Sequence, residues 1–130
     1  MIRTTQAFAP ILARNGGGAI INVLSRATWR PSPLLSAYSA SKAAVWSFTN
    51  SLRMQIKEQG TQVLALHVGF VDTDLARSLD VPKKAPAEVA GRTLDGLAAG
   101  KEEVLADEGT QLVKQGLSRE RPSYIDLEPP

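Results

Sequence analysis

A serine, a tyrosine and a lysine stand at spacings that could support proton transfer. Tyr38 and Lys42 are four residues apart in an alanine-rich segment with a helical period, so both side chains lie on one helix face. Ser25 stands thirteen positions before Tyr38, at the end of an apolar run that is typical of a buried strand. An ammonium group beside a phenol favours the phenolate form. Tyr38 is therefore a candidate general acid and base, and Ser25 is a candidate hydrogen-bond donor to a substrate oxygen.

The elements that must position these residues alternate between helices and strands. The hydrophobic periods predict strands at 19–24, 61–68 and 103–106, and helices at 2–14, 37–59, 86–99 and 107–118. Strand 61–68 is apolar along most of its length, which is typical of a strand covered on both faces. The alternation predicts an α/β fold with an open parallel sheet and helices on both faces.

The helix predicted at 37–59 has apolar side chains in two directions. One set recurs at core spacing, and it consists of Val45, Phe48, Leu52 and Ile56. Gly60 is expected to end this helix. Trp46 and Met54 lie outside the core stripe, so we expect a second face of helix 37–59 to pack against a partner subunit.

Composition excludes several classes of function. The 130 residues are 43% hydrophobic and 22% charged, which is ordinary for one soluble domain. Without cysteine there is no disulfide or thiolate chemistry, and a single histidine argues against a protein-held metal. The net charge of +2 comes from scattered basic residues, which predicts neither a nucleic-acid nor a membrane partner. No apolar run reaches transmembrane length, so we expect a cytoplasmic protein.

The spacing of Ser25, Tyr38 and Lys42 resembles the catalytic constellation of the short-chain dehydrogenase/reductase family. AIINVLS resembles that family's fifth strand, and AYSASKAAV resembles the start of its active-site helix. HVGFVDTDL, at 67–75, resembles the Pro-Gly segment after the sixth strand, although Val68 stands where proline is usual. The resemblance covers about residues 2–106.

This resemblance implies an enzyme that interconverts an alcohol and a ketone or aldehyde by hydride transfer with NAD or NADP. Ser25, Tyr38 and Lys42 would be catalytic, with Lys42 holding the cofactor ribose beside Tyr38. The resemblance also implies cofactor contacts from the segment after strand 61–68, made by Gly69, the backbone of Val71, and Thr73. The apolar loop after Ser25 and segment 74–85 would then wall a pocket for a small to medium hydrophobic substrate.

The family's first half is missing from this sequence. No glycine-rich turn follows a strand, so the cofactor's diphosphate- and adenosine-binding part is absent. We therefore expect residues 1–130 to form the C-terminal portion of a Rossmann-like doubly wound domain, with 119–130 as a flexible tail. We also expect an unpaired edge at strand 19–24 and bare helix faces. A complete enzyme would be a homo-oligomer through helix 37–59. The alternative is a catalytically silent remnant that acts at most as an interaction module.

Two other patterns suggest different chemistry. Ser25, His67 and Asp72 could form a hydrolase triad, but no Gly-x-Ser-x-Gly elbow surrounds Ser25. Three consecutive glycines at 16–18 could cradle a phosphate, but they follow a helix and precede a strand. The glycines are therefore interpreted as the end of helix 2–14 and a turn.

Overall fold

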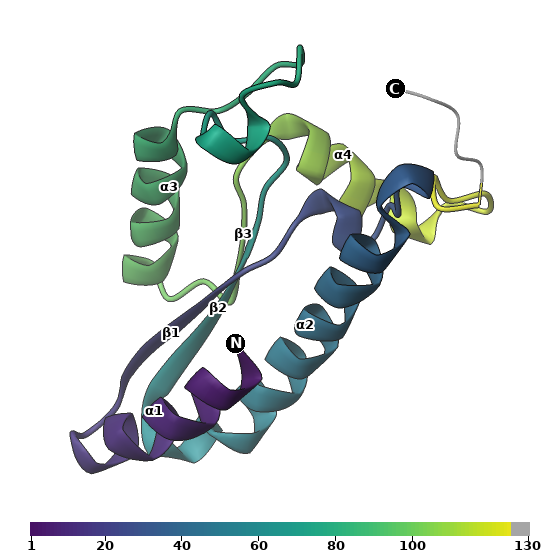
Figure 1. The fold of residues 1–130 in the computed structure, drawn as a ribbon. Helices are drawn as coiled ribbons and strands as arrows, with labels where there is room; N and C mark the ends of the chain where they lie inside the picture. The colour runs from purple at the N-terminus through teal and green to yellow at the C-terminus, as the bar shows by residue number, and fades with distance from the viewer. Residues whose placement is uncertain (126–130) are drawn as a thin grey trace.

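The computed structural model describes residues 1–125. Its helices and strands follow one another in the order α1 (Ile2–Arg14), β1 (Gly18–Val23), α2 (Ser36–Gln55), β2 (Thr61–His67), α3 (Pro86–Ala98), β3 (Glu103–Leu105) and α4 (Glu108–Gln115). Short 3₁₀ turns lie between several of them (Figure 1).

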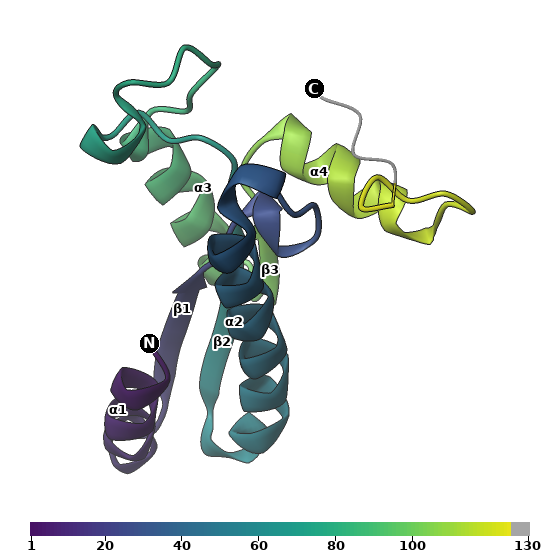
Figure 2. The same cartoon turned by 45° about the vertical axis from the view of Figure 1, so that its right-hand side comes forward.

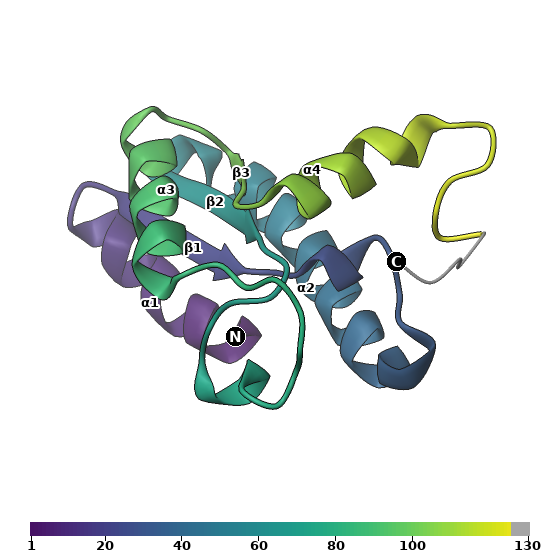
Figure 3. The ribbon, with the colours of Figure 1, turned by 90° about the horizontal axis from the view of Figure 1, so that it is seen from above.

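The three strands form one parallel sheet in the order β1-β2-β3. Gly18 pairs with Thr61 at the start of the sheet, and His67 pairs with Leu105 at its carboxyl end. Helices α1 and α2 lie against one face and α3 against the other, as the view from above shows (Figure 3). The predicted open parallel sheet with helices on both faces is confirmed.

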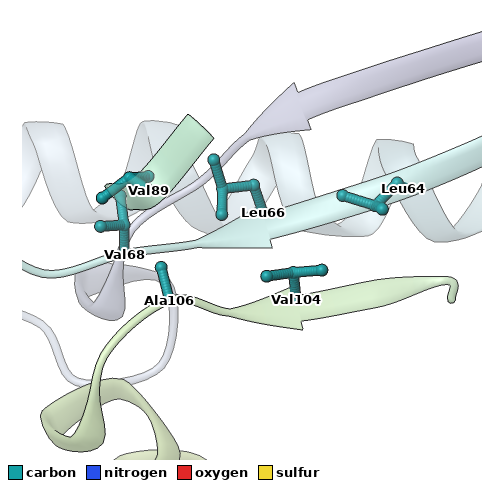
Figure 4. Packing of buried hydrophobic residues seen from close by; sticks show 6 residues of the cluster. All are labelled: Leu64, Leu66, Val68, Val89, Val104 and Ala106. Atoms are coloured by element: carbon teal, nitrogen blue, oxygen red, sulfur yellow. The ribbon is translucent and has the colours of Figure 1, made fainter. Parts of the chain in front are cut away.

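The hydrophobic core lies between the sheet and α3, and alternation along β2 explains it. Every second residue of a strand points to the same face. The buried side chains of this core are Leu64, Leu66, Val68, Val89, Val104 and Ala106 (Figure 4). Leu64 and Leu66 of β2 and Val68, which directly follows β2, are spaced two residues apart and point to the same face. Val89 of α3 packs over them.

Polar contacts attach α2 to the opposite face of the sheet. The buried Asn22 side chain of β1 donates a hydrogen bond to Thr49 Oγ1 at 3.0 Å. Arg53 donates from Nε to the Val63 carbonyl at 3.2 Å and from Nη2 to the Glu102 carbonyl at 3.0 Å. Together these bonds fix the position of α2 along β1 and β2.

The predicted core stripe of α2 packs toward the sheet, but the helix is shorter than expected. Leu52 is buried, and the other three stripe residues are half-buried. The α-helix ends at Gln55, and a 3₁₀ turn, Lys57–Gln59, leads to Gly60. Gly60 has a left-handed φ of 69°, which glycine adopts without strain, so its predicted role as the stop is confirmed.

The glycines at 16–18 end α1, as the sequence indicates. Gly17 donates a backbone hydrogen bond to the Leu12 carbonyl at 2.8 Å. A side chain at position 17 is impossible without rearrangement, because a Cβ atom would lie 2.2 Å from the Gly60 carbonyl oxygen. This close approach joins the start of β1 to the start of β2.

One edge of the sheet has no neighbour within residues 1–125. β1 pairs with β2 alone in this part of the chain. Val23 at its end and Phe8 of α1 are both more than half exposed. The expected unpaired edge and bare helix face are therefore present in the described residues.

The expected tail at 119–130 is only partly described. Residues 126–130 lie outside the described residues. Within the part that is described, Pro122 is buried and its carbonyl accepts a hydrogen bond from the Ile125 backbone amide at 2.9 Å.

Candidate active site

Tyr38 and Lys42 occupy adjacent turns at the start of α2, at the carboxyl end of the sheet. The Lys42 Nζ atom lies 5.6 Å from the centre of the Tyr38 ring. It also donates a hydrogen bond to the Val23 carbonyl at 2.9 Å, which ties it to the last residue of β1. Tyr38 is 42% exposed, so a molecule at this end of the sheet can reach its phenol group. The predicted pairing of these two side chains on one helix face is present.

Ser25 is held at the tip of β1 by its backbone neighbours. Leu24 donates a hydrogen bond to the Leu66 carbonyl at 2.7 Å, and Arg26 donates to the Val68 carbonyl at 3.0 Å. The Ser25 hydroxyl oxygen accepts a hydrogen bond from the Ala27 amide at 3.1 Å and so caps the 3₁₀ turn, Arg26–Thr28. Since the oxygen is the acceptor in this cap, the hydroxyl proton remains available to a substrate oxygen.

The loop after Ser25 is fastened to the first turns of α2. The Ser32 amide donates a hydrogen bond to Oγ of the buried Ser39 at 3.2 Å. Trp29 meets Trp46 of α2 edge to face, with ring centres 6.4 Å apart. These contacts join the turn after β1 to α2, and both this turn and the start of α2 lie at the same end of the sheet as the loop after β2 (Figure 2).

The segment that begins at Gly69 is held by backbone pairing with Lys84. The Lys84 amide donates to the Phe70 carbonyl and the Asp72 amide donates to the Lys84 carbonyl, both at 2.9 Å. The Val71 side chain packs against the hydrophobic core, which leaves its backbone as the part that can meet a ligand. Thr73 is exposed, and its hydroxyl is 3.4 Å from the Val71 carbonyl. β1 and β2 are neighbours, so this segment starts beside the Ser25 turn.

The structure rules out the hydrolase interpretation. His67 is fully buried at the end of β2, stacked on Trp29 with ring centres 3.8 Å apart. Ser25 Oγ accepts from the Ala27 amide, and no hydrogen bond joins this oxygen to the His67 imidazole. Asp72 is exposed. The candidate serine, histidine and aspartate therefore form no relay.

The buried rings of His67 and Trp29 lie next to two partly exposed charged side chains, Glu103 and Lys114. The His67 Nε2 atom lies 3.2 Å from Glu103 Oε1 without hydrogen-bond alignment, and Glu103 pairs with Lys114. The pKa of His67 is lowered to about 4, mainly by burial of the imidazole and to a smaller extent by the Lys114 charge. The Ser25 backbone raises this pKa and offsets part of the effect. His67 is consequently neutral at pH 7.

Sequence reasoning missed Asp107, which contacts the candidate cofactor segment directly. Its Oδ2 atom accepts a hydrogen bond from the Gly69 amide at 2.6 Å. The same side chain caps α4 by accepting from the Thr110 amide at 2.8 Å. The cap could have been recognised, because an aspartate directly precedes the predicted helical stretch Glu-Gly-Thr. The contact with Gly69 could not, because it joins positions 38 residues apart.

A surface depression of about 730 Å³ lies away from Tyr38 and Lys42, between α3, β3 and α4. Its lining is mixed in polarity and includes the charged residues Arg92, Asp95, Lys101 and Glu103. None of the residues at the carboxyl end of β1 lines it. We therefore assign the candidate chemistry to the Ser25, Tyr38 and Lys42 group on the basis of contacts rather than of cavity size.

Comparison with known proteins identifies the family of this chain. Residues 1–84 match the family model described as short chain dehydrogenase. This chain belongs to the short chain dehydrogenase family. The match contains the serine, tyrosine and lysine together with the segment after β2.

Two curated relatives and one solved structure show how much of the family the chain covers. It is 36% identical over 75 residues to dehydrogenase/reductase SDR family member 4 of Bos taurus, covering 58% of this chain and 27% of that protein. It is 34% identical over 103 residues to the very-long-chain 3-oxoacyl-CoA reductase of Coprinopsis cinerea, and this match covers 76% of this chain and 30% of that protein. A Burkholderia cenocepacia short chain dehydrogenase solved with NADP superposes with a TM-score of 0.86 and 34% identity, over 92% of this chain and 50% of that one.

The chain thus spans less than a third of these two curated relatives and half of that solved chain. The Rossmann-like character of the sheet is shown by the superposition. Among residues 1–125, no helix is both long enough and apolar enough to cross a membrane.

Proposed function

We propose that this chain carries the hydride-transfer site of an NAD(P)-dependent oxidoreductase that interconverts an alcohol and a ketone or aldehyde. The observation that carries the proposal is the position of Lys42. Its Nζ atom joins the Val23 carbonyl, two residues before Ser25, to the helix turn that bears Tyr38. This contact gathers all three candidate catalytic residues at the carboxyl end of β1, where ligands bind in open α/β sheets.

Each of the three side chains has a role that its surroundings support. Tyr38 donates a proton to the carbonyl oxygen in the reducing direction and accepts it in the oxidising direction. Ser25 uses its free hydroxyl proton to orient the same oxygen. Lys42 holds its ammonium group 5.6 Å from the centre of the Tyr38 ring, where it can also bind the cofactor ribose.

The proposed cofactor is NAD or NADP, which supplies the hydride when bound. The nicotinamide end has suitable partners in this chain: Lys42 for the ribose hydroxyls, and Gly69, the Val71 backbone and Thr73 for the carboxamide. The solved Burkholderia relative was described in complex with NADP, which supports this class of cofactor. Residues 1–125 contain no glycine-rich turn between a strand and a helix, so they offer no cradle for the diphosphate.

The proposed substrate is a small to medium hydrophobic alcohol or carbonyl compound. Leu34 in the loop after Ser25 is 93% exposed, and Leu75 in the loop after β2 is 92% exposed. Both loops leave the sheet at the end that bears Tyr38 (Figure 2). Contact with an apolar substrate would remove these apolar side chains from water, which is energetically favourable.

The alternative proposal is a catalytically silent interaction module. The exposed β1 edge and the exposed Phe8 side chain favour it, because both can pair with another polypeptide.

Self-association through α2 is a further proposal. Trp46 and Met54 on that helix are 36% and 74% exposed, as a second buried face would require.

The test is an activity assay on a fusion protein, in which the first, dinucleotide-binding half of a short chain dehydrogenase precedes this chain. We expect oxidation of NADH or NADPH when a hydrophobic ketone is added, and loss of that activity in Tyr38→Phe. A folded fusion that binds the dinucleotide but reduces no ketone would favour the silent module.

A further inference from the structure

We infer that Asp107 is the positioning residue of the nicotinamide-binding segment. This inference rests on the proposed function and extends it to a residue that contacts neither the reacting atoms nor Tyr38. Asp107 lies in the turn between β3 and α4, and its carboxylate accepts the Gly69 amide proton at 2.6 Å. Hydrogen bonds to an ionised acceptor are shorter and stronger than neutral ones.

The carboxylate is itself immobilised from the other side. Oδ1 accepts from the Thr110 amide at 2.8 Å, and Oδ2 accepts from the Thr110 hydroxyl at 2.9 Å. Thr110 is completely buried, so its side chain cannot turn to another partner in water. The two bonds from Thr110 therefore aim one carboxylate oxygen at Gly69.

The backbone on both sides continues this junction. The Ala106 amide donates to the His67 carbonyl at 2.9 Å, which extends the pairing of β3 with β2 by one step. The Asp107 contact with Gly69 comes directly after that step. At Gly69 the chain leaves the sheet, and its amide bonds to the Asp107 carboxylate where a residue within the sheet would bond to a backbone carbonyl.

The fit at this junction leaves little room for a side chain at position 69. A Cβ atom there would lie 3.3 Å from Asp107 Oδ2 and 3.4 Å from Oδ1, so the carboxylate would have to shift by a few tenths of an ångström. The crowding comes from the aspartate itself. Gly69 and Asp107 therefore constrain each other, and the path of residues 69–73 follows from where the carboxylate stands.

The two functions of Asp107 can be separated by substitution. Asparagine and serine are as good as aspartate at the start of a helix, so D107N and D107S keep the α4 cap. Asparagine has a single side-chain oxygen. If that oxygen accepts from the Thr110 amide, only the NH₂ group is left to face the Gly69 amide, and two donors cannot bond. Serine is too short to reach Gly69. D107A loses both functions, whereas E108Q removes the adjacent exposed carboxylate, leaves Asp107 and Thr110 in place, and is the matched control.

The experiment follows the backbone amides of the 130-residue chain by NMR, first in hydrogen exchange and then in titration with nicotinamide mononucleotide. In D107N and D107S we expect the Gly69 amide to exchange about tenfold faster or more, because a charge-assisted hydrogen bond is lost. We expect the mononucleotide to bind roughly threefold more weakly or worse, because the segment is no longer held in its binding geometry. E108Q should resemble the unaltered chain in both measurements.

A steric test from the other side provides a second readout. G69A alone should destabilise the chain, and D107S should relieve part of that loss, because the shorter side chain removes the clash. Unchanged Gly69 exchange and unchanged mononucleotide affinity in D107N and D107S would overturn the inference and reduce Asp107 to a helix cap. If the mononucleotide moves no signal even in the unaltered chain, the proposed function fails and this inference fails with it.

Discussion

The Lys42 ammonium donates a hydrogen bond to the carbonyl of Val23, nineteen residues earlier in the chain, at 2.9 Å. This bond fixes the ammonium above the end of β1, beside the Tyr38 ring. A solvated helix lysine would have no such fixed partner. The contact therefore makes the relation between the Ser25 turn and α2 a property of the fold.

Replacement of Tyr38 by phenylalanine removes the transferable proton and keeps the ring. In the fusion protein we expect Tyr38→Phe to lower kcat by about a hundredfold or more, which is the usual contribution of a well-placed general acid. Steady-state ketone reduction measures it. Tyr124→Phe is the matched control, since Tyr124 is similarly exposed but lies near the end of the described chain. Near-normal turnover in Tyr38→Phe would refute the assignment of the acid.

Replacement of Lys42 by methionine keeps most of the side chain's volume and removes its charge. We expect weaker binding of nicotinamide mononucleotide, and a loosened Ser25 turn because the bond to the Val23 carbonyl is lost. Lys57→Met is the control, because Lys57 lies exposed beyond the far end of α2. Equal mononucleotide affinity in the two variants would argue that Lys42 is only a structural link.

Acid should destabilise the fold through His67. Its pKa is about 4 in the folded chain and 6.5 in the unfolded chain, so only the unfolded chain takes up the proton as pH falls through 6.5. The free energy of unfolding should therefore decrease from pH 6.5 down to pH 4, by about 3 kcal/mol in total from this group. Urea unfolding at several pH values measures it.

The control for this pH effect is His67→Phe, which retains a ring against Trp29 but cannot titrate. Its stability should fall less steeply with acid than that of the unaltered chain. Parallel pH profiles for the two proteins would show that His67 does not set the acid sensitivity.

The two exposed leucines should determine which substrates fit. In the fusion protein we expect Leu34→Ala and Leu75→Ala to change the ratio of kcat/KM between bulky and small ketones by about ten- to two-hundredfold at most, as hydrophobic pocket contacts usually do. Leu94→Ala on α3 should leave that ratio unchanged, although Leu94 is also exposed. If all three variants gave the same ratio as the parent, the loops would not form the pocket.

The sequence predicted the order of elements because hydrophobic period and turn residues act locally. The stripe of α2 and the glycine at position 60 could be read from neighbouring residues alone. The α-helix nevertheless stops at Gln55, because its last turn tightens into a 3₁₀ turn before Gly60. Such adjustments at helix ends lie below what periodicity can resolve.

The candidate site was predictable only where its residues share one element or one motif. Tyr38 and Lys42 could be paired because a helix brings positions four apart together. Asp107 reaches Gly69 across the sheet, and Trp29 stacks on His67 through a loop, so neither contact has a local signature. Those contacts depend on tertiary packing, and His67 as a buried neutral residue could be recognised only once its neighbours were known.

We propose that this chain holds the nicotinamide part of a dinucleotide site without the diphosphate part. Mapping of backbone amide shifts in the 130-residue chain tests this, during titration with nicotinamide mononucleotide and separately with ADP. We expect the mononucleotide to move signals around Lys42 and from Gly69 to Thr73, and ADP to move none of them. Shifts caused by ADP alone, or mononucleotide shifts confined to residues away from α2 and the segment after β2, would refute the proposed nicotinamide site.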